Sequence, residues 1–148
     1  MKKLILIGLV LFTFDASAQD EPQKIINQFF DLYKNKGSNV ALDYVFSTNR
    51  WVSDSKDDIE SVKLKINNTV KQLGDYYGHD LITKKTIGDK FALYSFFVRY
   101  ERQPLRFTLQ FYNPNGQWRL QNFSYDDTFD DELKEASKVY RLKENLSQ

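Results

Sequence analysis

The chain has 148 residues, no cysteine, 21 basic and 20 acidic side chains, and a formal net charge of +1 at neutral pH. The absence of thiols excludes disulfide bonds, thiol catalysis and cysteine-ligated metal centres. The balanced charge argues against a nucleic-acid-binding protein, which needs a basic surface, and against electrostatic docking to anionic lipid. A chain of this length can form one hydrophobic core that is held together by packing alone.

The N-terminus has the pattern of a secretory signal peptide. Lys2 and Lys3 precede an apolar run over residues 4–14, and Ala16 and Ala18 place small side chains at the −3 and −1 positions of a cleavage site. The run is shorter than the ~20 residues that cross a bilayer, which disfavours the alternative of a membrane anchor. We predict a cleaved signal peptide over residues 1–18, a single α+β domain over residues 19–148, no integral membrane segment after cleavage, and a periplasmic or secreted location.

The first half of the mature chain has the apolar spacing of helices. Apolar residues recur every three to four positions and predict helices over residues 22–36, 39–46 and 57–76. Trp51 and Val52 are expected to anchor the linker before the third helix, and Ser55 opens a capping-box pattern. One face of the third helix is predicted to carry Ile59, Val62, Ile66, Val70 and Leu73.

After residue 80 the apolar period changes to two, which indicates strands. Strands are predicted over residues 81–87, 91–102, 105–112 and 117–125, followed by an amphipathic helix over residues 128–143. The segment Asn113-Pro-Asn-Gly116 is a strong signal for a hairpin between the last two strands.

Two strands have unusual patterns. In the last strand, Trp118 and Leu120 share one face and Phe123 and Tyr125 the other, so we expect a β-bulge that turns all four inwards. The second strand is apolar on both faces. Its outer face, which we place near Tyr94 and Phe96, is therefore expected to be covered by the C-terminal helix or by a second protomer.

This order of elements predicts an α+β fold in which three N-terminal helices pack on a curved four-stranded antiparallel sheet, with a C-terminal helix added. Three features carry a family resemblance: Phe29–Phe30 with Tyr33 in the first helix, Tyr76–Gly78 after the third, and Trp118–Leu120 after the last hairpin. With them the chain resembles exported members of unknown function in the nuclear transport factor 2-like (cystatin-like cone) superfamily. The resemblance implies helices packed in the concave side of the sheet. The superfamily contains isomerases, cyclases and dehydratases as well as non-catalytic modules, so the fold does not determine the function.

His79 is the only histidine and lies where the third helix leads into the sheet. It is a candidate general base at the mouth of the cone, oriented by Asp80 and beside Tyr76 or Tyr77. The alternative, which we favour, is a loop histidine without a chemical role. The chain has no G-x-S-x-G elbow of a serine hydrolase and too few nitrogen and sulfur ligands for zinc. We predict no catalytic residue, metal or cofactor, and keep His79 with Asp80 as the alternative.

Two charged groups are interpreted as structural. The acidic run over residues 126–132 lacks the spacing of a calcium loop, and Thr128 with Asp131 forms a capping-box pattern ahead of the last helix. Arg99 and Glu101 are assigned to the same inward register of the second strand as Phe97 and are interpreted as an exposed ion pair near the strand end. Isomerase chemistry of the ketosteroid type needs an inward carboxylate, and no strand position clearly supplies one.

The outer sheet face is the preferred functional surface, because tyrosine and arginine dominate binding hot spots. The alternative is an ordinary solvated face. The residues expected to lie together on it are Tyr94, Tyr100, Arg102, Arg106, Gln110, Tyr112, Arg119 and Gln121, with Tyr76 and Tyr77 at the cone mouth as further binding residues.

The leading hypothesis is an exported, non-catalytic binding or protein-interaction module. Either a small apolar ligand occupies the aromatic interior of the cone, or a partner or second copy of the chain docks on the outer sheet face. The alternative is a small enzyme of isomerase, dehydratase or hydrolase type that uses an acid/base residue at the cone mouth.

Overall fold

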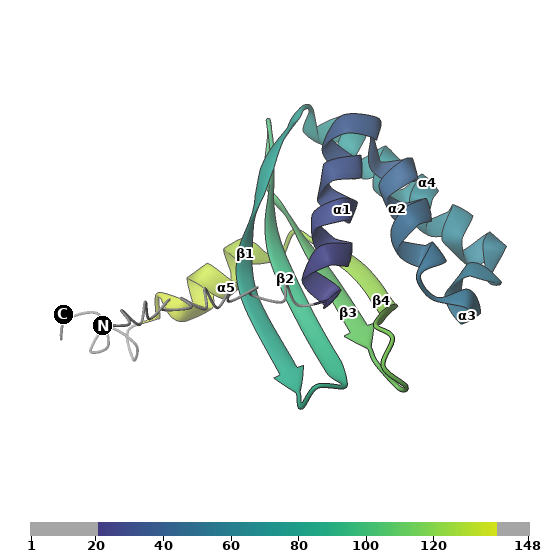
Figure 1. The fold of residues 1–148 in the computed structure, drawn as a ribbon. Helices are drawn as coiled ribbons and strands as arrows, with labels where there is room; N and C mark the ends of the chain where they lie inside the picture. Colours follow the sequence, from purple (N-terminus) through teal and green to yellow (C-terminus); the bar gives the residue numbers. More distant parts are fainter. Residues whose placement is uncertain (1–20, 139–148) are drawn as a thin grey trace, which may run out of the picture.

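The computed structural model describes residues 21–138. Four strands form one antiparallel sheet in the order β1-β2-β3-β4. The sheet curves around α1, the other N-terminal helices lie beyond α1 on the same side, and α5 projects on the opposite side (Figure 1). The elements are α1 (Glu21–Lys36), α2 (Ser38–Ser47), α3 (Arg50–Ser53), α4 (Lys56–Leu73), β1 (Tyr76–Ile87), β2 (Phe91–Tyr100), β3 (Leu105–Tyr112), β4 (Arg119–Asp126) and α5 (Phe129–Ala136).

This architecture confirms the predicted α+β class, with N-terminal helices on a curved four-stranded antiparallel sheet and a helix after it. The predicted signal peptide over residues 1–18 and the last part of the predicted C-terminal helix lie outside the described residues. Within residues 21–138, no helix combines the length and the apolarity that a bilayer crossing requires.

Aromatic side chains fill the space between α1 and the sheet. Phe29 of α1 is fully buried, and its ring centre lies 6.4 Å from that of Phe107 and 6.1 Å from that of Phe123. Each such buried ring contributes about 1.5–3 kcal/mol through removal of apolar surface from water. Strands β2 and β3 supply the sheet side of this core through alternate residues: Ala92, Tyr94, Phe96, Val98 and Tyr100, and Leu105, Phe107, Leu109 and Phe111.

The bulge expected in the last strand is present. Gln110 of β3 pairs with Asn122, whereas the next residue, Phe111, pairs with Leu120, so Gln121 is an extra residue in β4. Leu120 is fully buried on one side of this irregularity. Trp118, Phe123 and Tyr125 also pack against the core, as predicted.

The assignment of faces in β2 was wrong. Tyr94 and Phe96 are 0% and 3% exposed and face the helices. Phe97 faces the outer side instead, where its ring centre lies 5.1 Å from that of Phe129 in α5. The C-terminal helix therefore does cover part of the outer face, as expected, but the residue of β2 that it covers is Phe97 and not Tyr94 or Phe96. Because both faces of β2 are apolar, its period of two does not indicate which set turns inwards.

Several element boundaries also differ from the prediction. The linker that was to be anchored by Trp51 forms the short helix α3, and Trp51 is 62% exposed. Helix α4 ends at Leu73, because Gly74 adopts a left-handed φ of 80°, and Tyr76 already belongs to β1. A side chain at position 74 would also collide with Glu101, since a Cβ atom there would overlap the Glu101 carboxylate.

The two predicted capping boxes mark the helix starts but do not form. Neither Ser55 before α4 nor Thr128 before α5 makes a capping hydrogen bond through its side chain. The Thr128 hydroxyl instead donates a 2.9 Å hydrogen bond to Asp126. Local sequence therefore predicted where these helices begin, while the hydroxyl of Thr128 is used by a neighbouring carboxylate.

Two buried tyrosines meet between α1 and the end of β2. The Tyr33 and Tyr100 hydroxyl oxygens lie 2.5 Å apart. Burial raises the pKa of Tyr33 to about 12 and also raises the pKa of Tyr100, so both side chains stay neutral phenols over the ordinary pH range. Burial removes water as a hydrogen-bond partner for both hydroxyls, and each hydroxyl takes the place of that water for the other.

We expect Tyr33→Phe to lower the free energy of unfolding by about 1–3 kcal/mol, because it leaves the buried Tyr100 hydroxyl without this partner. The double variant Tyr33→Phe/Tyr100→Phe should lose less than the single variant, since both polar groups are then absent. Urea unfolding followed by circular dichroism measures the unmodified protein, the single variants Tyr33→Phe and Tyr100→Phe, and the double variant. A double variant as unstable as the sum of two damaging single variants would contradict this account.

Candidate functional site

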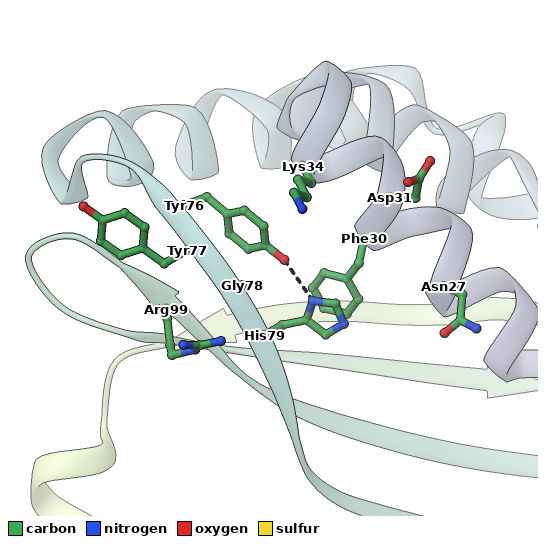
Figure 2. Close-up of a pocket in the computed structure, with 9 residues that line it drawn as sticks. All are labelled: Asn27, Phe30, Asp31, Lys34, Tyr76, Tyr77, Gly78, His79 and Arg99. Atoms are coloured by element: carbon green, nitrogen blue, oxygen red, sulfur yellow. Dashed lines mark hydrogen bonds between the residues drawn. The ribbon is translucent and has the colours of Figure 1, made fainter.

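A pocket of about 410 Å³ opens between α1 and the first residues of β1, and we call it the rim pocket. Figure 2 shows side chains from α1 on one side of it and side chains from β1 on the other. It is lined by Asn27, Phe30, Asp31 and Lys34 of α1, Tyr76, Tyr77, Gly78 and His79 of β1, and Arg99 of β2.

A strand irregularity brings the two principal polar side chains of β1 together. The pairing of β1 with β2 shifts register between Tyr76 and Gly78, so Tyr76 and His79 fall on the same side although three positions separate them. The Tyr76 hydroxyl oxygen lies 2.8 Å from His79 Nδ1, and the two groups are hydrogen-bonded. His79 is therefore a strand residue facing α1, which corrects its interpretation as a loop histidine.

The orientation of the His79 ring is determined by three contacts. It stacks on Phe30, with ring centres 3.5 Å apart and planes 8° from parallel. The ring of Phe96 meets it in an edge-on arrangement at 5.7 Å, and Tyr76 holds Nδ1. Nε2 points away from Tyr76, toward the side of the pocket where Asn27 lies (Figure 2). The arrangement presents one imidazole nitrogen to a molecule in the pocket.

Burial lowers the pKa of His79, and the Arg99 guanidinium lowers this pKa further, while the Asp80 carboxylate opposes both. Burial also raises the pKa of Tyr76 to about 12. At neutral pH the pair therefore consists of a neutral imidazole and a protonated phenol. If Tyr76 donates to Nδ1, Nε2 carries a proton and is a donor; if Nδ1 donates to Tyr76, Nε2 is an acceptor.

The sequence suggested that Asp80 orients His79, but in the structure it does not. Its carboxylate binds Arg99, with 3.0 Å between Oδ2 and Nε. Arg99 thus pairs with Asp80, and not with Glu101, and it lies on the exposed side of β2, not in the inward register. Arg99 crosses close to Gly78, where a Cβ atom would lie 2.8 Å from Nη2, so the glycine makes room for this ion pair.

The residues predicted for the outer sheet face do not form one surface. Tyr94 and Tyr100 belong to the buried core. Arg106 is covered by α5: its Nη2 lies 2.8 Å from Glu132, and its guanidinium lies 4.7 Å from the centre of the Phe129 ring. The face assignment failed for the two tyrosines because they occupy the inward set of β2.

The other residues that were predicted for the outer sheet face are dispersed over the structure. Arg102 donates a 3.0 Å hydrogen bond to the Gln72 carbonyl beyond the end of β2. Tyr112 and Arg119 lie at the other end of the sheet, where the guanidinium is 5.8 Å from the centre of the tyrosine ring. Of the predicted binding residues, the rim pocket contains only Tyr76 and Tyr77, together with the alternative catalytic residue His79.

Sequence reasoning missed the contribution of α1 to this site. Asn27, Asp31 and Lys34 recur at three- to four-residue spacing beside Phe30 and form a polar edge of the helix. That spacing was the available signal, but a polar edge on an amphipathic helix is also what solvent exposure produces. Across residues 21–138, no three histidine or acidic side chains are grouped closely enough to hold a metal ion.

Comparison of the whole chain with protein-family models, with curated proteins and with solved structures found no match. The function therefore has to be inferred from the geometry of the rim pocket.

Because His79 is the only histidine, its titration can be followed without ambiguity by proton NMR of untagged protein. We expect a pKa below the ordinary 6.5, raised by Arg99→Gln and lowered by Asp80→Asn, as the signs of the two charges require. Lys90→Gln, which removes the same charge in the turn at the far end of β1, should leave it unchanged. A pKa at or above 6.5 in the unmodified protein would contradict the burial of His79.

The lowered pKa also makes a prediction about stability. Between the folded-state pKa and the unfolded value of 6.5, the unfolded chain binds more protons, so stability is present above pH 6.5 and is lost as the pH falls through this window. His79→Phe keeps an aromatic ring against Phe30 but cannot titrate. Unfolding measured at about pH 7.5 and about pH 5 should show a smaller loss on acidification for the variant. Equal losses in the two proteins would be the opposing result.

Proposed function

We propose that this protein is a non-catalytic binding module whose rim pocket takes a small planar organic acid. The observation that carries the proposal is the stacked, neutral His79 imidazole, held by Tyr76 so that Nε2 is presented to the pocket. A neutral group with fixed orientation can hydrogen-bond a ligand without a cost for ordering its own side chain.

The apolar part of such a ligand has aromatic partners. The Phe30–His79 stack and the Tyr76 ring line the pocket, and Tyr77 at its mouth is 61% exposed. Exposed aromatic rings beside a pocket supply contact area with few rotatable bonds. A volume of about 410 Å³ suits a small organic molecule.

The polar part of the ligand is suggested by Lys34. No ion pair of Lys34 is seen within residues 21–138, and Asp31, one turn before it, accepts a 2.9 Å hydrogen bond from Asn35. The ammonium group is therefore free to meet a carboxylate, and Asn27 adds an amide on the same helix edge.

The closed core supports this location over the aromatic interior considered first. The rings of Phe29, Tyr33, Tyr94 and Phe107 are buried against one another and their neighbours, so side chains occupy the interior. Helices on the concave side of a curved sheet also support our proposal that the chain is a member of the nuclear transport factor 2-like superfamily. Export to the periplasm or medium remains part of the proposal on the strength of the N-terminal pattern.

A second candidate function, acid–base catalysis on the same ligand, is favoured by one specific observation. A neutral imidazole with Nδ1 held by another side chain is the arrangement of a general base, provided that Nε2 is unprotonated. In that case a bound molecule would be converted over time, and His79→Phe would abolish conversion. In the binding function it would be recovered unchanged.

The binding proposal is tested by titrating the purified protein with benzoate, 4-hydroxybenzoate and indole-3-acetate while His79 is observed by NMR. We expect saturable shifts with a dissociation constant in the millimolar range or tighter, as suits ligands of about ten heavy atoms. Lys34→Gln should weaken binding about tenfold or more through loss of the charge-assisted contact. Lys36→Gln on the same helix is the matched control and should bind normally. Absence of saturable binding by all three acids would exclude the proposed ligand class.

A further inference from the structure

A second pocket, of about 680 Å³, lies at the opposite end of the sheet from the rim pocket. It is formed by the start of α1, the junction of α2 with α3, and the hairpin between β3 and β4. We call it the hairpin pocket. Its lining consists of Glu21, Ser47, Thr48, Arg50 and residues 115–119.

A hydrogen-bonded clamp positions two arginines at this pocket. The buried Asn49 side chain donates a 2.7 Å hydrogen bond to the Leu120 carbonyl, and the Leu120 N–H donates a 3.0 Å hydrogen bond to the Thr48 hydroxyl. Arg50 directly follows Asn49, and Arg119 directly precedes Leu120. The clamp that joins the helical layer to β4 therefore also brings these two cationic residues to the same pocket.

Both arginines lack an acidic partner among the described residues. Arg99 and Arg106 form ion pairs with carboxylates, and Arg102 bonds a carbonyl, but no ion pair of Arg50 or Arg119 is seen within residues 21–138. The Arg119 Nε atom is buried and makes no hydrogen bond there. Two buried nitrogens of Arg106 also lack a hydrogen bond, but that guanidinium has the Glu132 carboxylate beside it, whereas Arg119 has no carboxylate among the described residues.

Groups inside the pocket do not supply the missing acceptor. Glu21 is the carboxylate in the described lining, and it lies 2.7 Å from Lys24. The Ser47 and Thr48 hydroxyls donate to carbonyls of their own helix. Arg50 and Arg119 both line this pocket, and an anion bound there would offset their positive charges.

We infer that the hairpin pocket binds a phosphate or sulfate group through Arg50 and Arg119. A guanidinium offers paired N–H donors that match the oxygens of such a group. Arg50 stacks on Trp51, with 4.5 Å from its guanidinium carbon to the ring centre, which supports the guanidinium plane while its edges stay available to an anion. The pocket has room for more than the oxyanion itself, so the group can belong to a larger molecule.

The experiment compares thermal shifts of the full chain in sodium phosphate, sodium sulfate, phenyl phosphate and sodium chloride at equal ionic strength. We expect the two oxyanions and phenyl phosphate to raise the melting temperature in a saturable way, and chloride not to. Arg50→Gln and Arg119→Gln should each weaken binding about tenfold or more. Arg102→Gln, which removes the same charge at the other end of the sheet, should bind as the unmodified protein does.

Arg119→Met keeps the proposal testable if the glutamine variants fold poorly. Because this change removes an unsatisfied buried group, we expect the variant to be at least as stable as the unmodified protein in chloride. In phosphate we expect it to be less stable than the unmodified protein, because it has lost one of the two arginines that bind the anion. Tighter binding of phenyl phosphate than of inorganic phosphate would assign the site to a phosphorylated organic molecule, and equal binding would assign it to the free anion. An increase in melting temperature that is the same in Arg50→Gln, Arg119→Met and the unmodified protein, or no increase at all, would overturn the inference.

The hairpin pocket and the rim pocket are tested independently. His79→Phe should leave the phosphate response unchanged, and Arg50→Gln should leave the binding of benzoate unchanged, because the two sites lie at opposite ends of the sheet.

Discussion

The packing of α1 against the concave face of the sheet is the interaction on which the rest of the structure depends. Ile26 and Phe29 have no exposed surface, and Phe29 alone contacts rings of α1, β3 and β4. A chain without disulfides needs such a densely packed interior for its stability. That interior is filled by side chains, and the two pockets that carry the functional proposals lie at opposite ends of the sheet.

Irregular strand pairing performs two tasks in this fold. In β4 the extra residue Gln121 turns Phe123 and Tyr125 to the same side as Leu120, which completes the core. In β1 the register shift near Gly78 places Tyr76 and His79 on one side, which creates the polar pair of the rim pocket. One additional residue reverses the face of every residue after it, so a single local change serves stability in one edge strand and the candidate site in the other.

The near-zero overall charge conceals local differences. At the rim pocket the ionic partners Arg99 and Asp80 neutralise each other, and burial keeps His79 uncharged. At the hairpin pocket, Arg50 and Arg119 have no such compensation within the described chain. The balanced composition therefore argues against a protein with a broad basic surface, as in nucleic-acid binding, but it carries no information about a site for one small anion.

The sequence by itself determined the order of the longer helices and of the strands, the alternation of β3, the hairpin before β4 and the bulge within it, because each depends on the spacing of neighbouring residues. Only the tertiary structure decided which apolar face of β2 turns inwards, and with it the burial of Tyr94 and Tyr100. It also decided which distant residues meet, such as Phe30 with His79 at the rim pocket. The apolar periodicity of a segment indicates which of its residues share a face of the helix or strand. It does not indicate which other segment that face contacts, because such contacts follow from how whole elements pack against one another.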